Sequence, residues 1–284
     1  ELSSFKCGHD APIYTVVEEA VQNSGTPYFC FKDIDENKPT GSIRIRVETI
    51  DYFLRRYRED LVRKLDTRSQ VEEQLADFLG CGAAVGLMSC THALFLALKA
   101  WGVGPGDEVL VPAMTFVASA GAVLHTGATP VFVDVDPRTG LIDLELAEQS
   151  IGPSTKALMV VHLYGHPTEM DPILETASRF GVSVVEDATE SLGSKYRGRF
   201  TGVLGQIGCL SFNGNKTLTS GGGGMIVSQD TNLLNRARLL TNQARDAGDE
   251  YFHSEVGYNY RLSNLHAAVG LAQFEQLDGF ISSR

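Results

Sequence analysis

The amino-acid sequence predicts an α/β protein with a mainly parallel sheet and helices on both faces of that sheet. Between about residues 83 and 227, apolar runs of strand length alternate with helical segments. This alternation is typical of parallel sheets, because each strand must return through a crossover to run beside the previous one. A length of 284 residues and a hydrophobic content of 43% also supply enough apolar side chains for a full core.

The part of the chain before this alternation is less regular. A short helix is expected at 11–22, followed by a polar, turn-rich loop at 23–42. Residues 47–80 interleave charged and apolar positions as a helix does, and Gly80 or Gly82 would end that helix.

The later elements are expected in turn along the chain. Strands are expected at 83–88, 108–112, 130–134, 157–163, 182–186, 209–212 and 224–227, the last antiparallel to its neighbour. Helices are expected at 91–101, 116–126, 144–151 and 170–180, and another begins near Asn264. Because such sheets bind ligands beyond the carboxyl ends of their strands, polar residues that follow a strand are candidates for a site.

Composition narrows the class of function and the compartment. A net charge of -11 and a pI near 5.1 disfavour nucleic-acid binding, which requires a basic surface. The five cysteines form no C-x-x-C pair, which disfavours a zinc or redox motif, and we expect no metal site. Scattered cysteines, the lack of an apolar signal core and the lack of a membrane-length apolar run together predict a soluble cytoplasmic protein.

The most informative segment contains a lysine between an apolar run and a glycine-rich turn. Lys216 follows the run that ends in Ser211 and precedes four glycines at 221–224, while the strand at 182–186 leads directly into Asp187. A lysine and an acid at neighbouring strand ends suit pyridoxal phosphate: the amine forms a Schiff base with its aldehyde, and the carboxylate keeps its ring nitrogen protonated. The alternatives are a solvated turn lysine and an acidic strand end that simply meets solvent.

Three further features could support such a cofactor. Residues 88–94 join a strand to a helix, and a helix N-terminus binds phosphate, with Thr91 adding a hydroxyl donor. The alternative is an ordinary N-cap by Ser89 or Thr91. The Ser211 hydroxyl could also reach the phosphate, and the glycines at 221–224 would let backbone pass close to a ligand, although a plain glycine hairpin would look the same.

Two ring-bearing residues also follow strands. Phe116 could stack on a flat cofactor ring, or it could be an ordinary core residue. His162 ends another strand, and here the sequence favours a hydrogen-bonded core histidine over a catalytic one.

Taken together, these segments resemble the DegT/DnrJ/EryC1/StrS family of PLP-dependent sugar aminotransferases. The segments that resemble it are 104–109, 128–136, 161–165, 186–193, 211–219 and 257–268, within a region that runs from about Ser69 to Arg284. The resemblance implies the type I PLP-dependent aminotransferase fold. It also implies transfer of an amino group from an amino acid, with glutamate expected, to a keto group of a nucleotide-linked deoxysugar, in the synthesis of cell-surface polysaccharides or secondary metabolites.

The family's motifs imply roles for nine residues. Lys216 would be the Schiff-base lysine and the general acid/base, and Asp187 would pair with the ring nitrogen. Glu190 would lie on the side of the ring's phenolic oxygen, and Phe116 would stack on the ring. The pairing of 187–193 with 211–216 most resembles the branch that aminates 4-keto-6-deoxy sugars for legionaminic-acid-type pathways.

The remaining implied roles concern the cofactor's phosphate. Thr91, the backbone of Cys90 and Ser211 would hold it within one subunit. Asn259, with Arg261, would reach the phosphate of the partner subunit's cofactor. The resemblance therefore implies a homodimer with shared active sites, a nucleotide-sugar substrate and an amino-acid donor, and no nucleic-acid or membrane partner.

The chain also departs from the family's pattern in three places. Cys90 stands where the family usually has glycine, and residues 23–66 do not match the short glycine-and-tryptophan segment of the family. The family's chains continue beyond Arg284 into a small C-terminal domain. We therefore expect an atypical N-terminal segment at 1–66, a large cofactor-binding domain at 67–245, and a partner-site loop and helix at 246–284 that lead to an absent small domain.

Two alternative functions remain at this point. Relatives that dehydrate sugars with the same cofactor have lost the Schiff-base lysine, usually to histidine, so Lys216 favours transfer over dehydration. The departures at Cys90 and in the N-terminal segment, together with the absent domain, would also fit a non-catalytic or truncated paralogue that acts as a binding partner.

Overall fold

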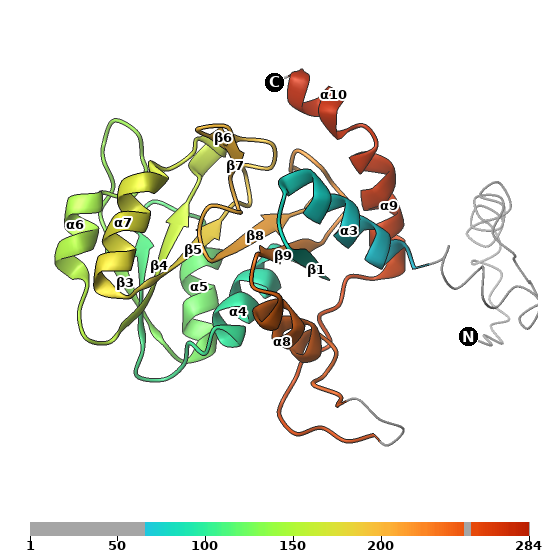
Figure 1. Ribbon diagram of the computed structural model, residues 1–284, viewed down its shortest axis with the longest axis horizontal. Coiled ribbons are helices and arrows are strands. Elements are labelled where there is room, and N and C mark those ends of the chain that lie inside the picture. The colour runs from blue at the N-terminus through green and yellow to red at the C-terminus, as the bar shows by residue number, and fades with distance from the viewer. Residues whose placement is uncertain (1–65, 247–250, 284) are drawn as a thin grey trace, which may run out of the picture. The chain divides into compact units, whose positions relative to one another are not determined.

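The computed structural model describes residues 66–246 and 251–283 (Figure 1). The helix predicted at 11–22, the loop predicted at 23–42 and all but the last residue of the predicted segment 1–66 lie outside the described residues. In the part of the chain that is described, no helix is both long enough and apolar enough to cross a membrane.

A seven-stranded sheet with the order β1-β9-β8-β5-β4-β2-β3 forms the centre of the described fold (Figure 1). Its strands are β1 (Ala83–Leu87), β2 (Glu108–Pro112), β3 (Thr129–Val133), β4 (Thr155–Val161), β5 (Ser183–Asp187), β8 (Ile207–Ser211) and β9 (Gly224–Ser228). Strand β9 is antiparallel to both β1 and β8, and every other neighbouring pair is parallel. The predicted α/β class, the mainly parallel sheet and the antiparallel strand at 224–227 are confirmed.

Helices cover both faces of this sheet. They are α3 (Thr67–Leu79), α4 (Cys90–Ala100), α5 (Val117–Thr126), α6 (Leu144–Ser150), α7 (Met170–Phe180), α8 (Thr231–Thr241), α9 (Asn264–Phe274) and α10 (Leu277–Ser282). Successive side chains of a strand point to opposite faces, so Val185 packs in one core cluster with α4, α5 and α8, whereas Val184 packs in another with α6 and α7. Helices α3 and α9 cover Leu210 and Met225.

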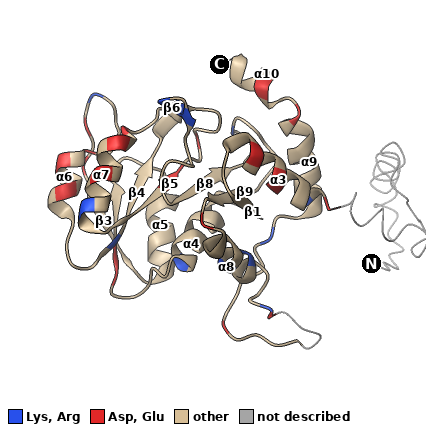
Figure 2. Ribbon diagram, in the orientation of Figure 1, with Lys and Arg blue, Asp and Glu red and all other residues tan. Residues whose placement is uncertain are grey.

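Several of the helices that flank the sheet carry acidic side chains. Figure 2 shows Asp and Glu on α3, α6, α7 and α10. The sheet itself is filled by fully buried aliphatic residues, such as Leu158 and Met159 of β4.

The first described helix begins later than the sequence predicts. Asp66 is the N-cap of α3, and its side chain accepts a hydrogen bond of 3.3 Å from the N–H of Ser69. The predicted helix at 47–80 therefore does not run through Asp66, because an N-capping aspartate takes a non-helical backbone conformation. The helix ends at Gly80 as predicted, with a left-handed φ of 70°.

Several short elements were not predicted. The strand expected at 157–163 ends at Val161, and the chain turns at Leu163–Gly165, where Tyr164 takes a non-helical, positive φ of 53°. The hairpin of β6 (Lys195–Tyr196) and β7 (Arg199–Phe200), and the helices α8 and α10, are also additions. Strands of two residues are too short to leave a periodic pattern in the sequence.

Candidate active site

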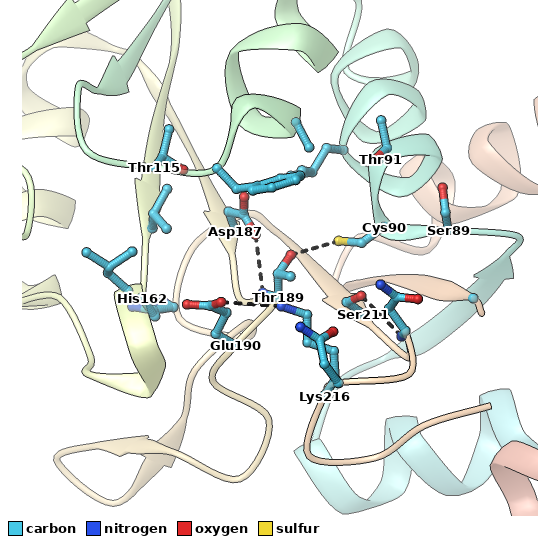
Figure 3. Close-up of a pocket in the computed structure, with 18 of the residues that line it drawn as sticks. Ser89, Cys90, Thr91, Thr115, His162, Asp187, Thr189, Glu190, Ser211 and Lys216 are labelled. Carbon is cyan, nitrogen blue, oxygen red and sulfur yellow. Dashed lines mark hydrogen bonds and ion pairs between the residues drawn. The ribbon is translucent and has the colours of Figure 1, made fainter. Parts of the chain in front are cut away.

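A cavity of about 560 Å³ opens beyond the carboxyl ends of the parallel strands (Figure 3). Each of the five strands β1, β2, β4, β5 and β8 contributes lining residues from the loop that follows it, among them Met88, Met114, Leu163, Thr189 and Asn213. This is the location expected for a ligand site in such a sheet. Seven predicted residues line the cavity: Cys90, Thr91, Phe116, Asp187, Glu190, Ser211 and Lys216.

Asp187 is the last residue of β5, and only 5% of its surface is exposed. Its Oδ2 accepts a hydrogen bond of 2.7 Å from the hydroxyl of Ser119, and its Oδ1 accepts one of 3.2 Å from the N–H of Thr189. Two donors from different elements thus fix the plane of the carboxylate. The preceding Glu186 is fully buried as well, so the alternative of an acidic strand end that meets solvent is wrong.

Lys216 lies in the loop between β8 and β9, and its side chain reaches back to Glu190. The distance from Nζ to Oε1 of Glu190 is 3.3 Å, and the lysine side chain is 15% exposed. The alternative of a solvated turn lysine is therefore wrong. The second oxygen of Glu190 accepts a 2.8 Å hydrogen bond from the N–H of Tyr164, so Glu190 connects the lysine to the turn after β4 (Figure 3).

The N-terminus of α4 opens onto the cavity opposite Ser211. Ser89 is its N-cap. The backbone of Ser89 is extended, and its side chain accepts a hydrogen bond of 3.3 Å from the N–H of His92. Cys90 and Thr91 form the start of the helix and line the cavity. Thr91 is thus not the cap, and its hydroxyl is available beside the positive end of the helix dipole, where an anion binds favourably.

The glycine-rich turn is required by close packing of the chain on itself. A Cβ atom on Gly224 would lie 2.5 Å from the backbone nitrogen of Cys90. Gly223 has a φ of 124°, a conformation that other residues rarely adopt. These two glycines let the start of β9 pass directly against the turn from Ser89 to Cys90, which forms one wall of the cavity.

Cys90 is buried, and its Sγ lies 3.0 Å from Oγ1 of Thr189. Burial, with a smaller contribution from the negative charge of Asp187, raises the pKa of the Cys90 thiol far above its usual value. The thiol is therefore neutral at physiological pH. It joins the start of α4 to the turn that follows Asp187.

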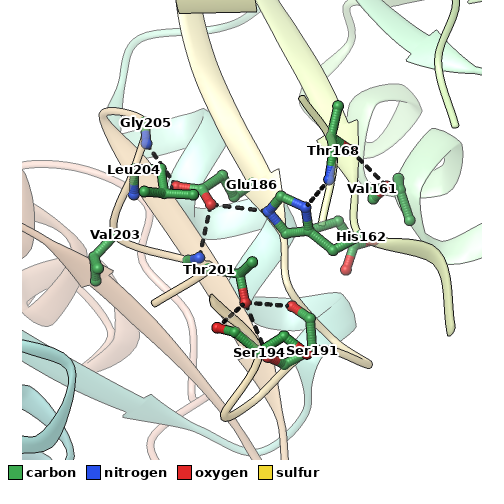
Figure 4. Close-up of polar contacts among 12 residues, drawn as sticks. Val161, His162, Thr168, Glu186, Ser191, Ser194, Thr201, Val203, Leu204 and Gly205 are labelled. Atoms are coloured by element: carbon green, nitrogen blue, oxygen red, sulfur yellow. Dashed lines mark hydrogen bonds and ion pairs between the residues drawn. The ribbon is translucent and has the colours of Figure 1, made fainter. Parts of the chain in front are cut away.

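The two ring-bearing candidates have opposite environments. Phe116 is 77% exposed at the mouth of the cavity, so it is not a core residue. His162 is fully buried. Its Nδ1 accepts a hydrogen bond of 3.1 Å from the N–H of Thr168, and its Nε2 lies 2.9 Å from Oε2 of Glu186 (Figure 4). The prediction of a hydrogen-bonded core histidine is confirmed.

Asn259 and Arg261 lie outside this cavity. Both are exposed, and their backbones form isolated bridges with Asn242 and Leu87 respectively. Neither residue lines the cavity of its own chain. Their predicted contact with a partner subunit's cofactor is therefore not made within this chain.

Sequence inspection missed four residues of the site. Thr115, Ser119, Tyr164 and Thr189 either line the cavity or contact a residue that does. Thr115 precedes the N-cap Phe116 and Ser119 lies in the first turn of α5, so helical periodicity gave no signal that their hydroxyls would meet.

The chemistry of the cavity fits the cofactor that the sequence predicts. A lysine amine, a buried carboxylate and a helix N-terminus with nearby hydroxyls match the aldehyde, ring nitrogen and phosphate of pyridoxal phosphate, respectively. Among residues 66–246 and 251–283, no group of three His, Cys, Asp or Glu side chains is placed to hold a metal ion.

Comparison with known proteins agrees with this chemistry. Residues 44–284 match the model of the DegT/DnrJ/EryC1/StrS aminotransferase family. The chain is 48% identical over 215 residues to the GDP-perosamine synthase of Caulobacter vibrioides, covering 76% of this chain and 58% of that protein. It is 42% identical to the UDP-N-acetyl-3-dehydro-alpha-D-glucosamine 3-aminotransferase of Acidithiobacillus ferrooxidans, covering 75% and 58%.

A solved structure extends the similarity to three dimensions. The crystal structure of DesV from S. venezuelae matches with a TM-score of 0.72 and 38% identity, covering 81% of this chain and 65% of that one. The chain thus spans little more than half the length of the curated relatives that it matches.

Proposed function

The chain belongs to the DegT/DnrJ/EryC1/StrS aminotransferase family, and from this premise we propose that it is a pyridoxal phosphate-dependent aminotransferase of nucleotide-linked sugars. It transfers an amino group from an amino acid, with glutamate as the expected donor, to a keto group of the sugar. The main support is the pairing of Lys216 with Glu190, 3.3 Å apart, in the same cavity as the buried carboxylate of Asp187.

The names of the relatives support the substrate class. One is named as a GDP-perosamine synthase, and another as an aminotransferase of a UDP-linked 3-keto sugar. The resemblance to the branch that aminates 4-keto-6-deoxy sugars points to the same class. A nucleotide-linked keto sugar is therefore the proposed acceptor, used in polysaccharide or secondary-metabolite synthesis.

Each proposed role follows from a position in the cavity. When bound, the cofactor supplies an aldehyde that takes up amines and a ring that withdraws electrons from the neighbouring carbon. Lys216 would hold it through Nζ, and the same nitrogen would take the proton from the substrate carbon and return it. Asp187 would accept a hydrogen bond from the ring N–H and so keep that nitrogen protonated, and Phe116 would cover the ring on the solvent side.

The phosphate would be held at the start of α4. Thr91, the Cys90 backbone and Ser211 line that part of the cavity. Glu190 would lie at the side of the ring's phenolic oxygen, where it already holds the lysine amine.

The proposal also includes a homodimer. Asn259 and Arg261 are exposed and lie outside their own cavity, so we infer that they reach the phosphate in the partner subunit. Residues 67–245 would then form the cofactor-binding domain, and 246–284 the segment that serves the partner's site. A cytoplasmic location, expected from the sequence, belongs to this proposal too.

The deciding experiment is the visible absorption spectrum of the purified protein with added pyridoxal phosphate, before and after excess glutamate. We expect a band that glutamate bleaches in the wild type and that is absent in Lys216→Ala. Lys156→Ala, which removes an exposed lysine at the start of β4, is the matched control and should keep the band.

The other outcomes identify the alternatives. A band that glutamate does not change would contradict transfer from glutamate and would favour sugar dehydration. The absence of any band in the wild type would favour a non-catalytic paralogue, and repeating the test on a longer chain would show whether segments outside these 284 residues are needed.

A further inference from the structure

A short chain of buried hydroxyls leads to the carboxylate of Asp187. Ser119 has no exposed surface and donates its hydroxyl hydrogen to Oδ2 of Asp187 at 2.7 Å. The hydroxyl of Thr115 lies 2.7 Å from the hydroxyl of Ser119. Because Ser119 has a single hydroxyl hydrogen and gives it to Asp187, Thr115 must be the donor in the second contact.

The other carboxylate oxygen is held from a different direction. Oδ1 of Asp187 accepts a hydrogen bond of 3.2 Å from the N–H of Thr189. The hydroxyl of Thr189 in turn lies 3.0 Å from the Cys90 thiol. Each oxygen of an ionised carboxylate has two lone pairs. With one donor for each oxygen among the described residues, both keep an acceptor position for a group in the cavity.

We propose that Ser119 is a positioning residue that orients the Asp187 carboxylate, with Thr115 holding the serine hydroxyl in place. The inference rests on the proposed function, because the group that would face Asp187 is the cofactor's ring nitrogen. The Ser119 hydroxyl holds one oxygen and the Thr189 N–H holds the other, so together they fix the plane in which the carboxylate would meet the ring N–H.

The first turn of α5 links the hydroxyl of Ser119 to the mouth of the cavity. Phe116 is the N-cap of α5 and has no side-chain capping bond. Its carbonyl accepts a hydrogen bond of 3.1 Å from the N–H of Ser119. One backbone turn thus sets both the exposed ring at the cavity mouth and the buried hydroxyl at Asp187. A shift of this turn would move the two together.

The test compares Ser119→Ala with Thr126→Val. Thr126 also has a buried hydroxyl on α5, bonded to the carbonyl of Val123 at 2.7 Å, but it does not line the cavity. Each protein is titrated with pyridoxal phosphate and with an analogue in which carbon replaces the ring nitrogen. Thermal unfolding of the cofactor-free proteins is measured in parallel.

We expect Ser119→Ala to bind pyridoxal phosphate at least about tenfold more weakly than the wild type, since a hydrogen bond to a charged group is lost. The analogue should bind the wild type and this variant equally, because it has no ring N–H. Thr126→Val should lose thermal stability without changing either affinity. Thr115→Val should weaken pyridoxal phosphate binding in the same direction but less, which provides a second test if Ser119→Ala fails to fold.

The outcomes separate this inference from the proposed function. Equal pyridoxal phosphate affinity in the wild type and Ser119→Ala, with strong binding in both, overturns the positioning role alone. Equal weakening of both ligands would also overturn it, because that pattern reflects general damage to the cavity. Failure of the wild type to bind pyridoxal phosphate at all would overturn the proposed function and this inference together.

Discussion

Nε2 of His162 lies 2.9 Å from Oε2 of Glu186, and neither side chain has any exposed surface (Figure 4). Glu186 also accepts backbone N–H groups of Gly202, Leu204 and Gly205, at 2.7, 2.7 and 2.6 Å. Because Glu186 directly precedes Asp187 on β5, the two carboxylates point to opposite faces of the sheet. Asp187 therefore faces the cavity. Glu186 lies behind it and joins β4, β5 and the 202–205 loop.

The first prediction concerns the buried pair of His162 and Glu186. Glu186→Gln should lower the free energy of unfolding by about 3–5 kcal/mol, because an amide cannot accept from all four donors and its own NH₂ would face them. Urea unfolding of the cofactor-free protein measures the change. The control is Glu148→Gln, which breaks an exposed pair with Arg179 and should cost about 1 kcal/mol or less. Equal losses in the two variants would contradict the role assigned to Glu186.

The second prediction concerns the strained turn after β4. Tyr164 combines a positive φ of 53° with an 82% exposed side chain, and its N–H is bonded to Glu190. Glu190→Ala should speed hydrogen exchange of that amide by at least about tenfold, because the bond to a charged acceptor is lost. Glu190→Gln retains a carbonyl acceptor and should stay close to the wild type. Exchange measured by mass spectrometry on a peptide that contains Tyr164 decides the matter, and equal rates in all three proteins would refute it.

Most of the fold follows from local sequence patterns, and the errors lie at the ends of strands and helices. The strand predicted at 157–163 runs two residues too far because Leu163 continues its apolar character. The turn that ends it depends on the contact between Tyr164 and Glu190, which lie 26 residues apart. The late start of α3 was visible in principle, since Asp66 precedes Ser69 by the spacing of an N-cap bond.

The residues of the candidate site likewise fall into those that the sequence could predict and those that only tertiary packing brings together. Lys216 and Asp187 could be predicted because each lies at or beyond the end of a strand, where side chains converge, and Glu190 was predicted from the resemblance to the family. Ser119 could not be predicted to meet Asp187, because 68 residues separate them and only the packing of α5 on the sheet brings them together. Cys90 stands where the family usually has glycine, and its contact with Thr189 is likewise set by tertiary packing.

The third prediction concerns pH. Burial, and then the nearby charge of His125, lowers the pKa of His92, whose ring stacks on Tyr260 at 3.9 Å. Its buried Nδ1 has no hydrogen-bond partner among the described residues. Since unfolded histidine takes up a proton near pH 6.5 and folded His92 resists it, stability should be full above about pH 6.5 and fall as the pH drops towards the folded pKa.

His92→Phe keeps the stacking and removes the titration. We therefore expect the melting temperature of this variant to fall less between pH 7 and pH 5.5 than that of the wild type. His253→Phe, at an exposed histidine whose Nδ1 is bonded to a backbone carbonyl, is the control. An equal fall in the wild type and in His92→Phe would show that His92 is not the titrating group.

The fourth prediction concerns thiol reactivity. Burial raises the pKa of Cys90 and of Cys209, so neither thiol ionises appreciably between pH 7 and pH 9. Labelling of the folded protein with iodoacetamide should leave both unmodified across this range, whereas the protein in urea should be labelled at both. Peptide mass spectrometry measures this at each position. Cys81, which is only half-buried, is the internal comparison, and labelling of Cys90 as fast as Cys81 would contradict the prediction.

The fifth prediction tests the charge of Asp187. Asn has the same shape and can still accept a hydrogen bond from Ser119 or Thr189, so Asp187→Asn should keep the fold and a melting temperature near that of the wild type. It removes the negative charge that would hold the ring nitrogen protonated, and the glutamate-dependent bleaching of the cofactor band should slow by at least about 100-fold. Stopped-flow absorbance gives that rate. Asp143→Asn, at the exposed N-cap of α6, makes the same chemical change away from the cavity and should leave the rate unaltered. A wild-type rate in Asp187→Asn would mean that the carboxylate is structural, and its assignment as the partner of the ring nitrogen would have to be abandoned.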